Sequence, residues 1–236
     1  MSQTQDRTSE GQRPATATNL TLLANPDSAT AEAYRSLRAS VKFAGVKPSV
    51  RSVLVADAGS KGQHSEVAAN LAAALALGGD PTILIDADLR QPALHQQFGA
   101  ANQFGLSDWL AAGDSAAPIP FIPTAIAGLS LLTAGTASGN RGFGAAPVDY
   151  LSSDHFVDLL QRLADSAEYL VFDAPSLADV GDALTVAARV DAVLLLVRSG
   201  RTKRAAAQKA KESLDRVGAR LLGAVLTDSG GGLRLW

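Results

Sequence analysis

Three aspartates stand where apolar segments end, and their carboxylates could bind a cation. Asp86 and Asp88 close the run TILIDAD, and Asp173 closes YLVFD. A carboxylate is tolerated at the rim of a buried strand because it can meet water, a cation or a hydroxyl there. Such oxygen ligands suit Mg²⁺, which takes one or two carboxylates together with phosphate. A single aspartate is better explained as a cap of the following turn or helix, but two strand ends, one with Asp-x-Asp, favour a metal or nucleotide site.

The segment between SVLVAD and SEVAANLAAALAL stands where a phosphate-binding loop is expected. The usual pattern is G-x-x-x-x-G-K-[ST], in which backbone N–H groups surround phosphate, lysine supplies charge and the hydroxyl binds Mg²⁺. This chain has AGSKGQHSE, so Ser65 keeps the hydroxyl position while Gln63 and His64 replace the glycine and the lysine. Taken alone, the segment does not qualify as a P-loop.

These replacements predict weak nucleotide binding. Gln63 disfavours any backbone conformation with positive φ, and a neutral histidine lacks the fixed charge and the reach of lysine. Losing one charged hydrogen bond to phosphate costs about 1.5–3 kcal/mol. Glycines and a helix N-terminus still provide a general anion site, and Lys61 can add charge from within the loop. We expect the nucleotide-binding residues to be Gly59, Lys61, Gly62, His64 and Ser65.

Short apolar runs alternate with helical patterns and must position these residues. Strands are predicted at 52–57, 82–88, 129–135, 169–175, 192–197 and 221–228, and helices at 28–43, 65–77, 149–166, 182–190 and 202–217. Continuous apolar strands separated by helices predict an α/β fold with a doubly wound, largely parallel sheet and helices on both faces. Ligands bind at the carboxyl ends of such strands, here 56–65, 86–90 and 173–175. The intervals 111–126 and 135–147 are expected to be loops.

Composition restricts the class of protein. The 236 residues are 47% hydrophobic, with a mean hydropathy of +0.10, which allows a sizeable core. The 21 Lys and Arg against 23 Asp and Glu give a net charge of −2, so no basic field indicates nucleic acid. Cysteine is absent, which excludes disulfides, thiolate zinc sites and thiol catalysis. No apolar run of about 18 residues is present, and we expect a cytoplasmic protein.

The motifs in this order resemble those of the bacterial tyrosine kinases of capsule and exopolysaccharide synthesis (BY-kinases), which are P-loop ATPases related to the MinD/ParA group. The strongest stretch, LIDADLRQPALHQQFG, resembles the Walker A′ motif of that family, with Asp86, Asp88, Arg90 and Pro92 matching. GLSDWLAAG and EYLVFDAPSLADVGDAL are also similar. The resemblance covers about 25–228 and implies a P-loop NTPase-like fold.

The resemblance also implies roles for individual residues. Asp86 and Asp88 would be catalytic, with Asp86 engaging a tyrosine hydroxyl or Mg²⁺, and the metal ligands would be Ser65, Asp88 and Asp173. Asp173 would hold the Walker B position and Asp182 that of a later aspartate. The family's partner is a membrane-embedded chain-length regulator, which here would be a separate protein holding the chain at the inner face of the membrane.

A helix at about 28–44 matches the family motif E-x-x-R-x-x-R with Glu32, Arg35 and Arg38. In the family this helix joins subunits into a ring, so the resemblance implies a homo-oligomer. From the residues alone, a spacing of three places the charges on one helix face, where they could equally pair with one another in solvent.

Two departures from the family pattern indicate a degenerate kinase. The Walker A glycine and lysine are replaced, and the C-terminal tyrosine cluster is missing: the tyrosines are Tyr34, Tyr150 and Tyr169, and the chain ends in SGGGLRLW. We interpret the protein as a pseudokinase of polysaccharide biosynthesis that keeps its acids, has weak or lost binding of ATP or ADP and Mg²⁺, and serves as an assembly or regulatory subunit.

Other interpretations stay open at this stage. An active ATP-dependent tyrosine kinase could use Lys61 in an unconventional loop, and a MinD/ParA-like positioning ATPase or a dinucleotide-binding oxidoreductase fits fewer of the motifs. A basic stretch over 198–211 is either a solvated face or a contact for acidic lipid or an acidic partner tail. For the domains we expect a flexible N-terminal lead-in over 1–24, a single P-loop-type domain over 25–228 and a Gly-rich tail over 229–236.

Overall fold

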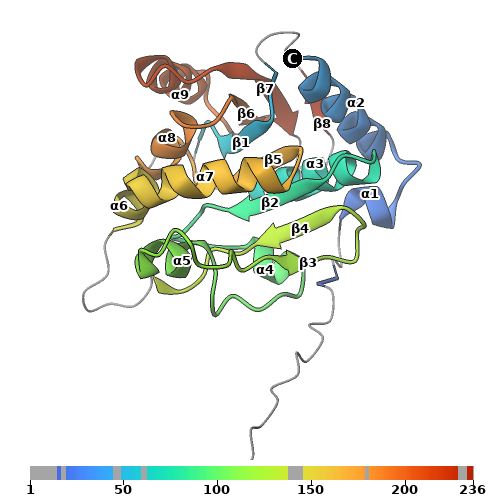
Figure 1. Ribbon diagram of the computed structural model, residues 1–236. Coiled ribbons are helices and arrows are strands. Elements are labelled where there is room, and N and C mark those ends of the chain that lie inside the picture. The colour runs from blue at the N-terminus through green and yellow to red at the C-terminus, as the bar shows by residue number, and fades with distance from the viewer. Residues whose placement is uncertain are drawn as a thin grey trace, which may run out of the picture.

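The computed structural model describes residues 15–16, 20–44, 49–59, 63–137, 146–178, 181–227 and 233–235. In this part of the chain one sheet has the strand order β3-β4-β2-β5-β1-β6-β7-β8 (Figure 1). The six inner strands run parallel, and β3 and β8 are antiparallel edge strands. The predicted α/β fold with a largely parallel sheet is confirmed. The strands are β1 (Ser52–Asp57), β2 (Thr82–Asp86), β3 (Ile122–Pro123), β4 (Leu129–Leu132), β5 (Tyr169–Asp173), β6 (Ala192–Arg198), β7 (Leu221–Thr227) and β8 (Leu233–Leu235).

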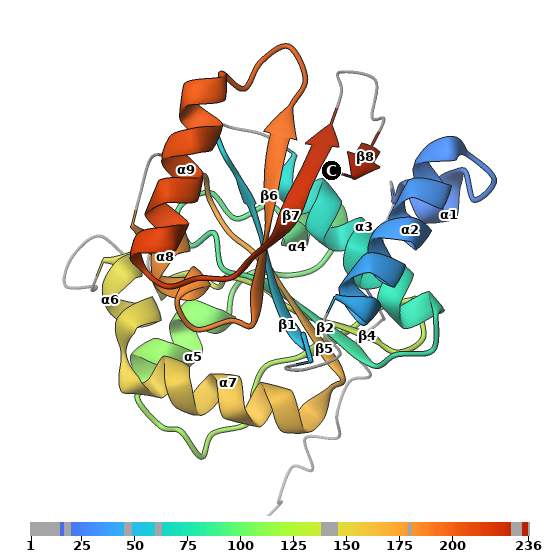
Figure 2. The same cartoon turned by 90° about the horizontal axis from the view of Figure 1, so that it is seen from above.

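Helices cover both faces of the sheet, as predicted (Figures 1 and 2). The face called here the α3 face is covered by α1 (Thr21–Ala24), α2 (Ala29–Phe43), α3 (His64–Leu77) and α4 (Leu94–Gln97). The opposite face is covered by α5 (Leu106–Ala112), α6 (Pro147–Ser152), α7 (Asp154–Ser166), α8 (Asp182–Ala187) and α9 (Arg204–Arg216). Each face therefore has its own apolar core.

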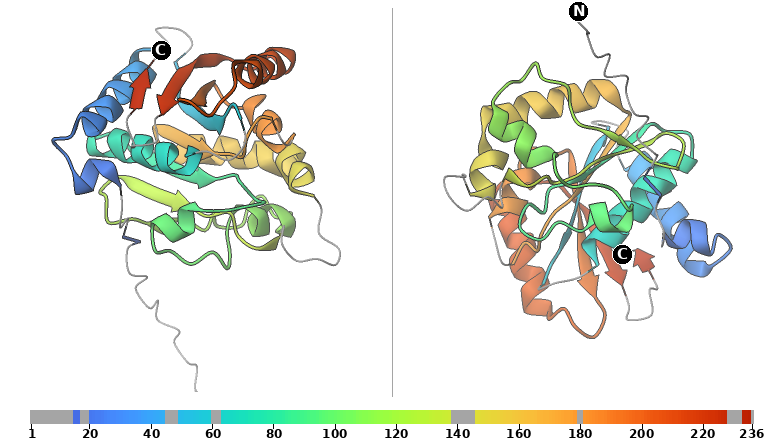
Figure 3. Two further views of the ribbon diagram at one scale, coloured as in Figure 1. Left: turned by 180° about the vertical axis from the view of Figure 1, so that it is seen from behind. Right: turned by 90° about the horizontal axis from the view of Figure 1, so that it is seen from below.

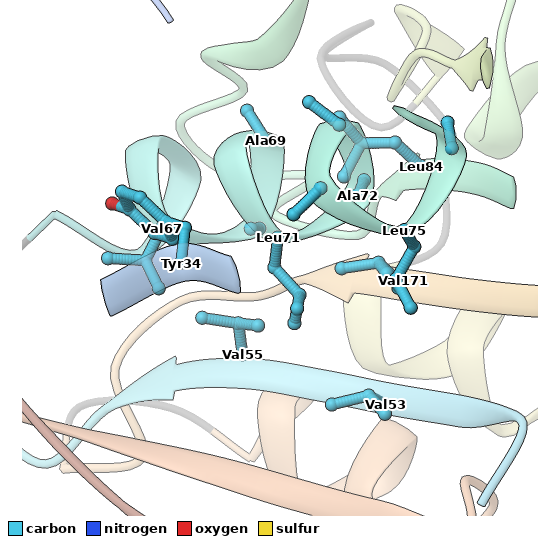
Figure 4. Close-up of a cluster of buried hydrophobic side chains, with 14 of the residues drawn as sticks. Tyr34, Val53, Val55, Val67, Ala69, Leu71, Ala72, Leu75, Leu84 and Val171 are labelled. Carbon is cyan, nitrogen blue, oxygen red and sulfur yellow. The ribbon is translucent and has the colours of Figure 1, made fainter. Parts of the chain in front are cut away.

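The α3 helix is the central element of its face. It is apolar nearly all round because it lies between the sheet and α2, and a helix buried on several sides needs no polar stripe. Leu71 and Leu75 point from α3 toward Val55 and Val171 on the strands beneath (Figure 4). This packing fixes the N-terminal end of α3, which carries His64 and Ser65, over the carboxyl edge of the sheet.

Local capping explains where two helical segments begin. As predicted, Ser28 caps α2, and its Oγ accepts a hydrogen bond from Ala31 N (3.1 Å). The segment 149–166 forms two helices rather than one, because Ser153 is extended (φ −68°, ψ 158°) and its Oγ accepts from Phe156 N (3.2 Å). A serine inside a helical pattern thus starts a second helix.

The packed structure begins earlier than the expected boundary at residue 25. The expectation of a flexible lead-in over 1–24 is wrong at its C-terminal end, where Thr21–Ala24 forms α1. Leu22 is buried, and its backbone N–H donates to Oδ1 of the buried Asn70 on α3 (3.2 Å). Ala15 N also donates to Pro123 O (2.9 Å) beside β3. A polar composition did not reveal these contacts because each partner is far away in the sequence.

Two short edge strands were not expected. In the predicted tail over 229–236, Leu233–Leu235 forms β8 against β7 and beside α2 (Figure 3). In the predicted loop over 111–126, Ile122–Pro123 forms β3 against β4. Strands of three and two residues carry no periodic signal, so only their hydrogen-bonded neighbours define them. No helix in the described ranges is long and apolar enough to cross a membrane.

Candidate functional site

Three strands end in an aspartate on the α3 face of the sheet. Asp57, Asp86 and Asp173 are the last residues of β1, β2 and β5, and their exposed fractions are 5%, 0% and 0%. Alternate residues of a strand face the same side, and Val53 and Val55 of β1 belong to the core under α3. Each aspartate continues such a row, and Asp86 and Asp173 lie opposite each other between β2 and β5. Three carboxylates therefore gather under the start of α3.

His64, the first residue of α3, binds this acidic cluster. Its Nδ1 lies 2.6 Å from Asp173 Oδ1, and its Nε2 lies 4.0 Å from Asp88 Oδ2. Ser65 Oγ lies 3.3 Å from the same Nδ1. The His64 ring is 14% exposed. The structure thus brings together four of the predicted residues, His64, Ser65, Asp88 and Asp173, with the imidazole between the two carboxylates.

The charge of His64 differs from the sequence-based expectation. Burial alone would lower the pKa of its imidazole, but the charge of Asp173 and the hydrogen bond to it, with smaller contributions from Asp57 and Asp88, raise that pKa from 6.5 to about 9. The ring is therefore a cation at neutral pH. The prediction of a neutral histidine is wrong because the sequence did not show that position 64 would meet several acids.

Asp86 supports the loop that follows β2. Its Oδ1 accepts from Asp88 N (3.2 Å), and its Oδ2 accepts from Ala93 N (3.2 Å) and Leu94 N (3.1 Å). Burial, together with the charge of Asp173, raises the pKa of the Asp86 carboxyl well above its ordinary value. In this arrangement both carboxylate oxygens are used to hold the loop, and contact with an acceptor hydroxyl stays a prediction.

Asp88 is held by the same loop but keeps one oxygen for the site. Its Oδ1 accepts from Arg90 N (3.2 Å) and Gln91 N (2.9 Å), which leaves Oδ2 toward His64. Burial raises the pKa of its carboxyl. The Arg90 side chain forms a two-fold contact with the buried Asp182, from Nε to Oδ2 (2.5 Å) and from Nη2 to Oδ1 (3.2 Å). This ion pair ties the Asp88 loop to α8.

Oxygen atoms of the kind that Mg²⁺ prefers lie around the His64 ring. Asp173 Oδ2 is buried and has no hydrogen-bond partner in the described chain, Ser65 Oγ lies 3.3 Å from His64 Nδ1, and Asp88 Oδ2 lies 4.0 Å from His64 Nε2. Within the described residues, no group of three or more histidine, aspartate or glutamate side chains is arranged to hold a metal ion. Ser65, Asp88 and Asp173 would hold Mg²⁺, which supplies positive charge to phosphate oxygens when bound. A cavity of about 340 Å³ adjoins them and is lined by Gln63, His64, Ser65, Glu66, Asp88, Gln91, Ala93 and Gln97.

The phosphate loop is described only at its two ends. Lys61 and Gly62, which we predicted to bind nucleotide, lie outside the described residues. Gly59 is described at the end of β1, where a side-chain Cβ would stand 3.5 Å from Thr202 Cγ2. The first part of the loop therefore borders the turn between β6 and α9.

The predicted oligomer residues make contacts within the chain. Arg35 binds Glu32 Oε2 through Nη1 (2.9 Å) and Pro26 O through Nη2 (2.5 Å). Arg38 Nη1 donates to Ala74 O (3.2 Å) near the end of α3. Glu32 is exposed and Arg35 half-buried on the α2 surface, so both can reach a second subunit, while Arg38 also secures α2 against α3. The ring contact stays a prediction.

Sequence reasoning missed Asp57. Its strand, SVLVAD, ends in an aspartate just as TILID and YLVFD do, and that shared ending was the available signal. The structure places the charge of Asp57 close enough to raise the pKa of His64.

Comparison with known proteins identifies the family. No family model matches the chain. The chain is 32% identical over 213 residues to the tyrosine-protein kinase YwqD of Bacillus subtilis, which covers 88% of this chain and 85% of that relative. It belongs to the bacterial tyrosine kinase family. The kinase domain of the Escherichia coli tyrosine kinase ETK matches this BY-kinase with a TM-score of 0.81 at 26% identity, over 93% of this chain and 84% of that chain. The chimeric protein CapA2B2 matches with a TM-score of 0.80 at 28% identity, over 91% and 92%.

The His64 cation predicts a pH-dependent stability for this BY-kinase. Because the pKa of His64 rises from 6.5 to about 9 on folding, its stabilisation is complete below pH 6.5 and is lost as the pH rises through 9. The total is on the order of 3 kcal/mol. We expect the free energy of unfolding, measured with urea from pH 6 to pH 10, to fall more steeply for the native chain than for His64→Gln. Parallel curves for the two proteins would contradict the assignment.

The pair between Arg90 and Asp182 predicts an energetic coupling. Arg90→Gln leaves the buried Asp182 carboxylate without its cation, and we expect the free energy of unfolding to fall by about 1–3 kcal/mol. Arg90→Gln combined with Asp182→Asn should restore part of that loss. Urea unfolding of the two single variants and the double variant provides the measurement. Simple additivity of the two single effects would show that the pair does not fix the loop.

Proposed function

We propose that this BY-kinase is a degenerate member of its family, which binds ATP or ADP with Mg²⁺ weakly and transfers little or no phosphate. Its role would be that of an assembly or regulatory subunit in capsule or exopolysaccharide biosynthesis. The observation that carries the proposal is the 2.6 Å contact between His64 and Asp173. The position that normally supplies a phosphate-binding lysine here directs its positive charge to an acid of the metal site.

Two physical effects follow from that contact. A cation fixed beside Asp173 lowers the attraction of the cluster for Mg²⁺, because the ion and the imidazolium repel each other. The histidine side chain is also shorter than that of lysine and is already hydrogen-bonded to Asp173. It therefore contributes less binding energy to a phosphate group farther out in the loop. The acids thus remain in place while both the metal and the phosphate are bound less strongly.

The partner and the location follow from the family resemblance. We propose a membrane-embedded chain-length regulator as partner, which would bring this protein to the inner face of the cell membrane. We also propose a homo-oligomeric ring formed through the α2 helix, supported by the exposed Glu32 and the half-buried Arg35 on its surface.

An active tyrosine kinase is the second candidate, and the retained acids favour it. Asp173 Oδ2 has no hydrogen-bond partner among the described residues, so this oxygen is available to bind a metal ion. Lys61 could then supply the missing charge. The two candidates differ in one measurable property, which is phosphate transfer by the native chain.

A restored phosphate loop tests the degenerate-kinase proposal. We expect Gln63→Gly with His64→Lys to bind Mg-ATP at least tenfold more tightly than the native chain in calorimetry, because one charged hydrogen bond to phosphate is worth about 1.5–3 kcal/mol. The native chain should show no transfer of labelled phosphate to a tyrosine-containing polymer. Transfer by the native chain that is abolished in Asp88→Asn would overturn the proposal and establish the active kinase.

The α2 surface predicts the oligomeric state. We expect Glu32→Ala with Arg35→Ala to reduce the mass measured by light scattering, because it removes the charges available for contact between subunits. Lys211→Ala with Asp215→Ala is the matched control, since it removes another exposed ion pair, on α9, with the same change in charge. An unchanged mass in the α2 variant, or an equal loss in the control, would exclude the ring contact.

A further inference from the structure

Arg198 is the basic counterpart of the acidic cluster at the same edge of the sheet. It is the last residue of β6, whose alternate residues Leu194 and Leu196 lie in the core under α3. Arg198 continues that row, so its side chain starts on the α3 face, like Asp57 on the neighbouring β1. Asp57 pairs with Leu196, two residues before Arg198. The strand order β2-β5-β1-β6 thus places three aspartates and then an arginine along one edge.

The guanidinium of Arg198 has no partner in the described structure. Arg198 is half-buried, its Nε is buried, and no hydrogen bond or ion pair of its side chain occurs in the ranges described. Two other arginines are satisfied: Arg51, just before β1, donates to three carbonyl groups, and Arg162, within α7, donates to two. A buried guanidinium donor without an acceptor costs free energy unless a ligand supplies the acceptor.

The surroundings of Arg198 connect it to the phosphate loop. Its backbone N–H donates to Thr202 Oγ1 (2.9 Å), and Thr202 is the side chain that faces Gly59 at the start of that loop. Arg201, Lys203 and Arg204 are exposed on the same turn. No acidic residue occurs from 192 to 211, so the charges that this segment itself carries are all positive.

We propose that Arg198 binds a phosphate group of the nucleotide. This inference rests on the proposed nucleotide site. A guanidinium can give two parallel hydrogen bonds to phosphate oxygens, which suits an anion placed across the end of β1. Along this edge of the sheet, the aspartates of β2 and β5 would then lie on one side of β1 and the phosphate-binding cation of β6 on the other.

Binding of metal-free pyrophosphate tests this assignment. Calorimetry with the native chain, Arg198→Gln and the control Arg201→Gln measures the anion site without the magnesium site. We expect Arg198→Gln to weaken pyrophosphate binding at least tenfold, Arg198→Lys to weaken it less, and Arg201→Gln, an exposed neighbour of equal charge, to change it less than about threefold. The midpoint of thermal unfolding should not fall in Arg198→Gln, since no contact within the described chain is lost.

Three results would overturn the assignment. These are native-like binding by Arg198→Gln, equal losses in Arg198→Gln and Arg201→Gln, which would indicate a diffuse basic surface, and no pyrophosphate binding by the native chain. The proposed function fails on a different result, phosphate transfer to tyrosine by the native chain. Because pyrophosphate binding without metal does not report transfer, the two failures are distinguishable.

Discussion

The hydrogen-bonded contact between His64 and Asp173 determines the state of the whole site. Three aspartates are buried under the start of one helix, where their charges repel one another unless a proton or a cation neutralises them. Here the chain supplies that cation itself, because the pKa of His64 rises to about 9. If the site neutralises its own acids in this way, it depends less on a bound metal ion, and this is the physical basis of our proposal that the kinase is degenerate.

Asp86 and Asp88 stabilise the loop after β2 through backbone hydrogen bonds, whether or not they also take part in catalysis. Asp86 accepts three backbone N–H groups, and Asp88 accepts two more. Replacing either residue would leave several donors in a tight loop without acceptors. The pair between Arg90 and Asp182 then fastens that loop to the opposite face of the sheet. The Walker A′ residues can therefore persist for folding alone, and their presence is not by itself proof of phosphate transfer.

Charge is separated across the site rather than mixed within it. The β2 and β5 strands carry acids at their ends, and β6 carries Arg198. The phosphate loop begins on β1, between these two groups. A ligand with a metal-bound end and a phosphate-bearing end would match that order. In our proposal position 64 of the loop has no lysine to bind phosphate, and Arg198 on β6 supplies positive charge for it instead. The binding proposals for His64 and for Arg198 thus describe two sides of one redistribution of charge.

The sequence by itself determined the sheet, most helices and the acids at the strand ends, because continuous apolar runs and caps such as Ser28 are local signals. It also identified position 64 as unusual. Only the tertiary structure decided the charge of His64 and the use of both Asp86 oxygens by the backbone. It also decided the hydrogen bond from Leu22 N to Asn70 and the lack of a side-chain partner for Arg198 among the described residues. These properties depend on groups that are distant in the sequence and meet only when parallel strands align their ends, so no pattern of neighbouring residues contains them.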